Sequence, residues 1–333
     1  MSCDLNRSAD QRQILDAAEA MLGQAYPLAR LRGGVADDLG ALAEFGTFLL
    51  ALPEEAGGAG FSLVEEALVH VALGRHLLSP RSLAAALAVR LAGQGGDAGL
   101  AEEIAGGGRD VAAAVPSAGG LLLLDPGAAD LALVFGPRRL DLRPIAGARP
   151  ETGLGHDLRV ARMEDAPEGA LFTSTAPGDL ALTDLLVSAQ CLGVAEAARD
   201  LAVDYAGVRK QFGQLIGGFQ AIKHHCANMA LGTERLSALL DFAALSLAGG
   251  VEDAAFQIAA LRRLAPGIAR RNAALCVQIH GGIGFSEEAD AHRFVKQAHL
   301  LGCLGQGAPL LDLAAPLAPH TTATQEDAEC ASH

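Results

Sequence analysis

The sequence predicts a mainly α-helical protein with a small central β domain. Apolar residues recur at the helical period in the first third of the chain and again in its last half. Between these parts lie short apolar runs separated by Gly, Pro and Asp, which are typical of strands and turns. We expect an N-terminal helical domain over 1–108, a reduced β domain over 109–178, a C-terminal four-helix bundle over 179–315 and a disordered tail over 316–333.

Two helix starts can be placed from capping signals. Ser8 and Gln11 have the spacing of a capping box, and so do Ser62 and Glu65. In each pair the serine would begin a helix and the residue three positions later would bond back to it. Helices of the first domain are expected over 39–51, 64–76 and 81–93.

The middle of the chain is too short for more than a small sheet. Its apolar runs predict strands at 111–115, 121–124 and 131–135. The helical pattern then returns in four long segments, which an antiparallel bundle would bury. These segments cover roughly 181–208, 218–249, 252–280 and 287–315.

Composition excludes several classes of function. The net charge of −14 argues against binding to nucleic acid or to an anionic membrane, since both need basic patches. No uninterrupted apolar run reaches the ~18 residues that span a membrane. The six cysteines are scattered and show no metal-binding spacing. We expect no metal site and no nucleic-acid or membrane partner, and we expect a cytoplasmic location.

One unusual segment lies between the first two helices of the bundle. It reads Y-A-G-V-R-K-Q-F-G-Q-L-I-G-G-F-Q and runs from Tyr205 to Gln220. An isolated arginine at a helix end, such as Arg209, usually only complements the helix dipole. A guanidinium is also suited to hold a diphosphate through two parallel hydrogen bonds. Core packing does not explain why Arg209, Phe212 and Gln220 stand where one helix should end and the next begin.

A second unusual segment, C-V-Q-I-H-G-G-I-G-F, begins at Cys276. A glycine after a helix is usually only a C-cap. Gly281 and Gly282, with a third glycine nearby, indicate a backbone that a ligand approaches closely. A lone histidine such as His280 is more often structural than catalytic, and we interpret it as structural.

Both segments resemble the flavin-contacting segments of the acyl-CoA dehydrogenase family, and L-P-E-E-A-G-G-A-G-F-S (52–62) resembles part of that family's helical first domain. The resemblance implies an FAD cofactor bound between subunits. It implies that Arg209 contacts the flavin pyrophosphate of the neighbouring subunit, and that Phe212 and Gln220 lie close to the cofactor. Gln278, Gly281 and Gly282 would contact its adenosine-diphosphate half.

The chain departs from this family at its catalytic base. The family removes the α-proton of an acyl-CoA with a glutamate while a hydride moves to the flavin. The resemblance aligns that position with Gly305, or, in members that carry the glutamate on an earlier helix, with Thr183. Asp184 is the nearest substitute, although one residue turns a helical side chain by ~100°. The family's T-E-P-x-x-G-S-D segment and its later tryptophan strand are also missing.

The favoured hypothesis is therefore a base-less subunit of a heteromeric enzyme. The chain resembles the shortened bacterial members that form α2β2 heterotetramers, in which a second acyl-CoA dehydrogenase subunit carries the base. The resemblance implies an acyl-CoA substrate in lipid or steroid metabolism. Two alternatives remain open: a self-sufficient homo-oligomeric dehydrogenase with a relocated base, Asp184 first, or a helical scaffold without a cofactor.

Overall fold

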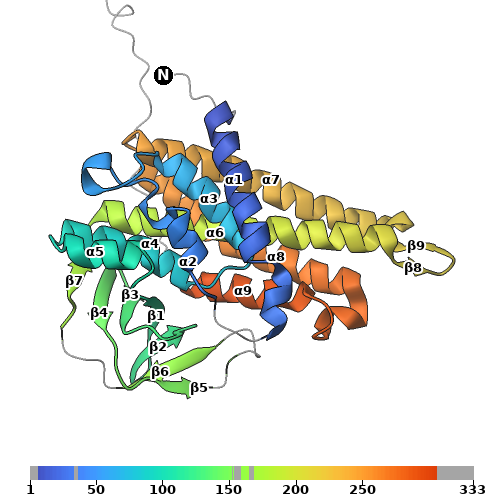
Figure 1. The fold of residues 1–333 in the computed structure, drawn as a ribbon. Coiled ribbons are helices and arrows are strands. Elements are labelled where there is room, and N and C mark those ends of the chain that lie inside the picture. Colours follow the sequence, from blue (N-terminus) through green and yellow to red (C-terminus); the bar gives the residue numbers. More distant parts are fainter. Residues whose placement is uncertain (1–6, 34–36, 152, 154–158, 165–168, 306–333) are drawn as a thin grey trace, which may run out of the picture.

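The fold class predicted from the sequence is confirmed. The computed structural model describes residues 7–33, 37–151, 153, 159–164 and 169–305. Helices at the N-terminal end, one seven-stranded sheet and a long helical bundle follow one another along the chain. Figure 1 shows the sheet below the helices, with α4 and α5 between it and the rest. The predicted disordered tail lies outside the described residues.

Capping side chains begin two of the N-terminal helices as expected. Ser8 Oγ accepts the backbone N–H of Gln11, and Gln11 Oε1 accepts that of Ser8. Ser62 and Glu65 form the second capping box. The helix expected over 39–51 is wrong, because Gly46 adopts a left-handed φ of 76° and ends it. The elements are α1 (Ala9–Ala25), η1 (Leu28–Gly33), α2 (Gly40–Glu44), η2 (Thr47–Leu49), η3 (Glu54–Ala56), α3 (Leu63–Arg75), α4 (Arg81–Gln94) and α5 (Ala98–Ala105).

The sheet contains the three predicted strands and four that the sequence did not reveal. Its order is β5-β6-β2-β1-β3-β4-β7, and only β1 and β3 are parallel. The missed strands are short and partly polar, so their alternation of apolar and polar residues is weak. The strands are β1 (Val111–Ser117), β2 (Gly120–Leu124), β3 (Leu131–Gly136), β4 (Arg139–Pro144), β5 (Arg149–Glu151), β6 (Val160–Met163) and β7 (Phe172–Ser174).

The two faces of the sheet pack into two different hydrophobic cores. Side chains alternate along β1, so Val111 and Ala113 join the main core beneath α4, and Ala112 and Ala114 join a small separate one. This explains why a strand of small residues is buried on both sides. The β domain is thereby fixed against the helices through one face only.

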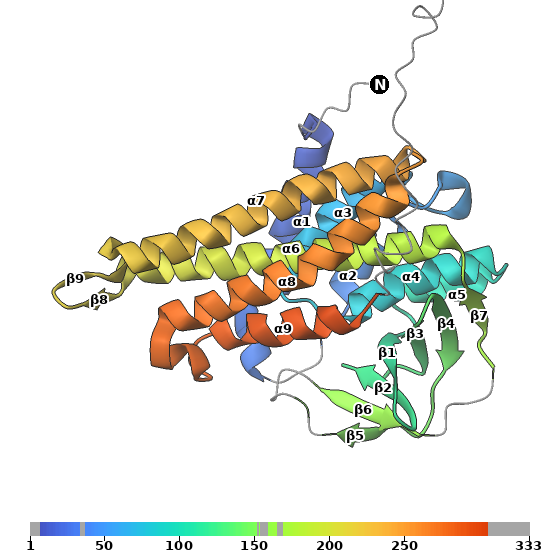
Figure 2. The same cartoon turned by 180° about the vertical axis from the view of Figure 1, so that it is seen from behind.

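The bundle consists of three long helices and one shorter helix. They are α6 (Pro177–Val208), α7 (Gln220–Ala248), α8 (Ala254–His280) and α9 (Ala291–Cys303). The expected last helix starts later than predicted, at Ala291, after a short 3-10 helix η5 (Gly281–Phe285). Figure 2 shows α6 running behind α8 through the middle of the molecule.

Helix α6 lies at the centre and contacts α3, α7, α8 and α9. It is long and apolar enough to cross a membrane by composition, but 78% of its most apolar window is buried inside the protein. A helix that is apolar on all sides and covered by other helices is typical of the core of a globular protein. Its apolar surface is therefore used for packing.

Two glycines allow α3 and α6 to cross closely. A Cβ at Gly193 would lie 2.0 Å from the carbonyl oxygen of Val71, and a Cβ at Gly74 would lie 2.2 Å from that of Gln190. No side chain fits at such distances without moving the helix backbone. The position of α3 on α6 thus depends on these two residues.

We expect Gly193→Ala to lower the free energy of unfolding by about 1–3 kcal/mol or more, because the helices must separate. Denaturant unfolding followed by circular dichroism measures this. Gly267→Ala in α8 is the matched control, since nothing lies within 4 Å of its added Cβ. That control should be neutral or stabilising by up to ~1 kcal/mol. Equal effects of the two substitutions would contradict the close crossing.

A polar cluster is buried where α3, α4 and α6 meet. Glu66 accepts a 2.5 Å hydrogen bond from Arg90, and the amide of Gln190 lies 3.2 Å from Nδ1 of His70. The Nε2 atom of His70 is buried without a partner. Burial, with a smaller contribution from the charge of Arg90, lowers the pKa of His70 to about 3. His70 is therefore a neutral core residue at neutral pH.

This predicts a loss of stability in acid. Below pH ~6.5 the unfolded chain takes up a proton on His70 that the folded chain excludes until about pH 3. Over that window His70 should lower the ratio of folded to unfolded protein roughly tenfold per pH unit. The free energy of unfolding of His70→Leu should therefore fall less steeply from pH 7 to 4, and that of the exposed control His299→Leu should follow the wild type.

Candidate functional site

An open hollow lies at the end of the bundle where α6 ends and α7 begins. Its volume is about 680 Å³, and we call it the bundle-end hollow. Figure 1 shows this end projecting away from the sheet, with the hairpin β8–β9 at its tip. It is lined by Tyr205, Arg209, Gln211, Phe212, Ile216, Phe219, Ala221, Ile222, Gln278, Ile279, His280, Gly281, Gly282 and Ile283.

A tight hairpin forms one wall of the hollow. Strands β8 (Lys210–Gln211) and β9 (Gln214–Leu215) are joined by Phe212 and Gly213, with φ of 50° and 80°. Two consecutive positive φ values give the reversed turn that suits a two-residue hairpin. The Phe212 side chain is 91% exposed and meets Phe219 edge to face at 6.2 Å. The hairpin therefore places an aromatic ring in solvent at the edge of the hollow.

The opposite wall is the glycine turn after α8. Gly281 ends the helix with φ 68° and ψ −143°, a conformation that favours glycine strongly. Nothing lies within 4 Å of a Cβ added at Gly281 or Gly282, so their backbone faces open space. At Gly284, by contrast, an added Cβ would lie 2.7 Å from the carbonyl oxygen of Val277. The first two glycines leave room for a ligand, and Gly284 serves packing.

The hollow has a positive rim in an acidic protein. In the described part of the chain Arg209 and Lys210 form no ion pair, although the net charge is −14. Both side chains are exposed, and Arg209 lines the hollow. A guanidinium without a carboxylate partner is available to an anionic group of a ligand.

Five of the six residues predicted to contact a cofactor meet at this hollow. They are Arg209, Phe212, Gln278, Gly281 and Gly282, which come from two segments separated by two long helices. Gln220, the sixth, is the first residue of α7; it is exposed and does not line the hollow. Their roles in binding stay predictions, but the two motifs converge as the resemblance implies.

The hollow also contains a pair of residues that sequence reasoning did not assign to it. The ring of His280 stacks on that of Tyr205, with centroids 4.1 Å apart and planes inclined by 17°. Nδ1 of His280 lies 2.8 Å from the carbonyl oxygen of Cys276. Burial raises the pKa of Cys276 to about 12, so its sulfur remains a neutral thiol. Tyr205 is distant in sequence, and no pattern indicated the stack.

The positions considered for a catalytic base meet at a different place. Thr183 is fully buried in α6, and its hydroxyl donates to the carbonyl oxygen of Asp179. Asp184 is 5% exposed, and its Oδ1 lies 3.4 Å from Nε of Arg262. Gly305 adopts φ 76°, and a Cβ there would lie 2.6 Å from that same Oδ1. The structure therefore brings the aligned positions together but leaves no room for a side chain at Gly305.

Arg262 holds the end of α9 against Asp184. Its guanidinium donates to the carbonyl oxygens of Gly302 and Leu304, in addition to its pairing with Asp184. The side chains of Arg262 and Asp184 are both only 7% exposed. The aspartate is covered by a guanidinium and by backbone, so a substrate proton has no open approach to it in this conformation.

The buried cluster of Thr183, Asp184 and Gly305 and the bundle-end hollow lie at opposite ends of α6. At 1.5 Å per residue, roughly 37 Å of helix separates Asp184 from Arg209. One ligand in the hollow therefore does not lie beside the aligned base positions of the same chain.

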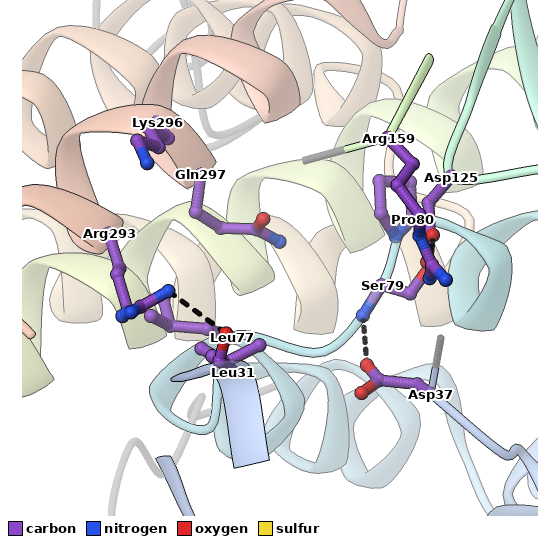
Figure 3. Close-up of a pocket in the computed structure, with 10 residues that line it drawn as sticks. All are labelled: Leu31, Asp37, Leu77, Ser79, Pro80, Asp125, Arg159, Arg293, Lys296 and Gln297. Atoms are coloured by element: carbon purple, nitrogen blue, oxygen red, sulfur yellow. Dashed lines mark hydrogen bonds and ion pairs between the residues drawn. The ribbon is translucent and has the colours of Figure 1, made fainter. Parts of the chain in front are cut away.

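A second, smaller pocket lies where the N-terminal helices, the sheet and α9 meet (Figure 3). Its volume of about 40 Å³ is enough for water only. Asp37 accepts the backbone N–H of Ser79 at 2.9 Å, and Asp125 pairs with Arg159. Gln297 of α9 donates to the carbonyl oxygen of Leu78. The first two bonds each lie within one part, and the bond from Gln297 joins α9 to the N-terminal helices. The pocket is best described as the place where the three parts meet.

A metal site was not expected. No group of three His, Cys, Asp or Glu side chains able to hold a metal is found among the residues that the structure describes.

Comparison with known proteins agrees with the motifs and the fold. Residues 175–308 match the model of the acyl-CoA dehydrogenase C-terminal domain. Acyl-CoA dehydrogenase IpdE2 of Mycobacterium tuberculosis is 30% identical over an alignment of 306 positions, which covers 87% of this chain and 91% of that protein. Butyryl-CoA dehydrogenase from Megasphaera elsdenii has the same fold, with TM-score 0.74 and 22% identity over 91% of this chain and 96% of that one. A chain of the ChsE4–ChsE5 complex from M. tuberculosis has TM-score 0.70 and 22% identity, covering 90% and 95%.

The buried pair of Asp184 and Arg262 gives a prediction. Arg262→Met removes the guanidinium that pairs with the buried Asp184 carboxylate, which should lower the free energy of unfolding by about 3–5 kcal/mol. Arg263→Met, at the exposed neighbouring position, should change it by less than ~0.5 kcal/mol. Adding Asp184→Asn to Arg262→Met should recover part of the loss. If denaturant unfolding gave equal values for both single variants, the burial of the pair would be refuted.

Proposed function

Because this chain belongs to the acyl-CoA dehydrogenase family, we propose that it is the base-less subunit of a heteromeric acyl-CoA dehydrogenase. The reaction is the α,β-dehydrogenation of an acyl-CoA thioester with FAD, in lipid or steroid metabolism. This chain supplies half of an FAD site through the bundle-end hollow. A second acyl-CoA dehydrogenase subunit supplies the catalytic base and the rest of that site.

The observation that carries the proposal is the contrast between the two ends of α6. At one end an open hollow gathers Arg209, Gln278 and two glycines. At the other, Gly305 stands at the family's base position, and a side chain there would collide with the Asp184–Arg262 pair. The bundle-end hollow therefore presents groups suited to a cofactor, and the position of the family's base is filled by buried residues of the chain itself.

The residues of the hollow fit the adenosine-diphosphate half of FAD. A diphosphate needs charged donors, and Arg209 offers a guanidinium without an ion-pair partner among the described residues. Gly281 and Gly282 leave the space that a Cβ would fill. An adenine needs an aromatic or apolar wall, and Phe212 and Phe219 provide one. FAD, when bound, accepts the hydride from the substrate; the residues of this chain bind and orient its distal half.

The exposed rim of the hollow supports a partner subunit. Phe212 and Phe285 are 91% and 78% exposed, and large apolar side chains held in solvent typically mark an interaction surface. The structural neighbour ChsE4–ChsE5 is by its description a complex of two proteins. We propose a similar pairing for this chain, with the flavin at the boundary.

Neither alternative is favoured by a specific observation. A self-sufficient dehydrogenase would need Asp184 to reach a substrate, but that carboxylate is covered by Arg262 and Gly305. A scaffold without cofactor gives no reason for a positive hollow bordered by two open glycines. Both remain distinct outcomes of the following experiment.

In the complex with its partner subunit, Arg209→Ala should weaken FAD binding about 10- to 100-fold, because charge-assisted hydrogen bonds to the diphosphate are lost. FAD released on dilution, followed by flavin fluorescence, measures this. Arg209→Lys should recover part of the affinity, because it restores the charge but not the two-pronged geometry.

The control is Arg235→Ala, an exposed arginine on α7 away from the hollow, which should bind FAD like the wild type. FAD affinity unchanged by Arg209→Ala would rule out the half-site. A complex without any flavin would favour the scaffold.

A further inference from the structure

The contacts of His280 fix the tautomer of its neutral ring. Nδ1 lies 2.8 Å from the carbonyl oxygen of Cys276. A carbonyl oxygen only accepts hydrogen bonds, so Nδ1 carries the proton. In the neutral ring, Nε2 is then left with its lone pair as a hydrogen-bond acceptor.

The ring is also fixed in position. His280 is 8% exposed, and its stack on Tyr205 holds one face of the imidazole against α6. Nε2 makes no hydrogen bond with the described residues, yet it is not among the buried polar atoms that lack a partner. Since His280 lines the hollow, Nε2 is the atom that it offers there.

A hydrogen-bond acceptor such as Nε2 can pair with only part of a nucleotide. The phosphates of a nucleotide are acceptors, and Arg209 supplies donors for them. The hydrogen-bond donors of a nucleotide belong to the nucleoside, namely the amino group of adenine and the hydroxyls of ribose. A neutral Nε2 would repel a phosphate oxygen and accept from a nucleoside donor.

We propose that His280 is a specificity-determining residue, which accepts a hydrogen bond at Nε2 from the nucleoside of the bound dinucleotide. The inference rests on the half-site proposed above. Tyr205 orients the imidazole by stacking, and the Cys276 carbonyl fixes its tautomer. The site therefore discriminates between nucleosides with and without that donor.

The test uses the FAD-free complex with the partner subunit and ADP, with dissociation constants measured by isothermal titration calorimetry. ADP is compared with purine riboside diphosphate, 2′-deoxy-ADP and 3′-deoxy-ADP, each of which lacks one donor of ADP and adds none. His280→Leu should weaken ADP binding roughly fivefold, as expected for one neutral hydrogen bond. The analogue that lacks the donor accepted by Nε2 should bind the wild type roughly fivefold more weakly than ADP does. The same analogue should bind His280→Leu as tightly as ADP binds that variant. That analogue identifies the donor.

His299→Leu, an exposed histidine on α9, is the matched control and should bind all four ligands like the wild type. If His280→Leu does not fold, the ¹⁵N resonance of Nε2 in the wild type answers the question: it should shift with ADP and not with one analogue. Equal weakening of all four ligands, or no weakening, would refute the role of His280 and leave the half-site intact. A wild-type complex that binds neither FAD nor ADP would remove the half-site and this inference together.

Discussion

The 32-residue helix α6 is the constraint on which the rest of the structure depends. It is covered by α3, α7, α8 and α9, and two glycines let α3 approach its backbone closely. A rigid buried helix holds its two ends at a fixed distance. Asp184 near one end and Arg209 just past the other therefore belong to different sites, and a single chain does not join them.

At each end of α6 the site is formed with the same two neighbours, helix α8 and the residues that follow α8. At one end Arg262 of α8 reaches Asp184 and the carbonyl oxygens of Gly302 and Leu304 at the end of α9, and this closes the position aligned with the family's base. At the other end the last turn of α8 delivers His280, Gly281 and Gly282 to the hollow. The proposed function assigns the open end to a cofactor shared with another subunit, and at the other end Asp184 and Arg262 are part of the buried interior.

Sequence reasoning was most successful where the pattern is local. Capping boxes at Ser8 and Ser62, the long helices and the three most apolar strands follow from periodicity and side-chain chemistry. Four strands were missed because short, partly polar strands are defined by their neighbours in the sheet. The motifs predicted which residues gather at the hollow, except Gln220. The Tyr205–His280 stack and the burial of Asp184 by Arg262 join residues far apart in sequence, so only the folded chain reveals them.

The central claim is that this chain holds half of a flavin site. The visible absorbance of the purified chain, alone and co-purified with an acyl-CoA dehydrogenase encoded beside it, tests this most directly. The account predicts a nearly colourless isolated chain and a yellow complex with fewer than one flavin per chain. One FAD bound per isolated chain would contradict it and would mean that a complete site exists, with the search for a relocated base beginning at Asp184.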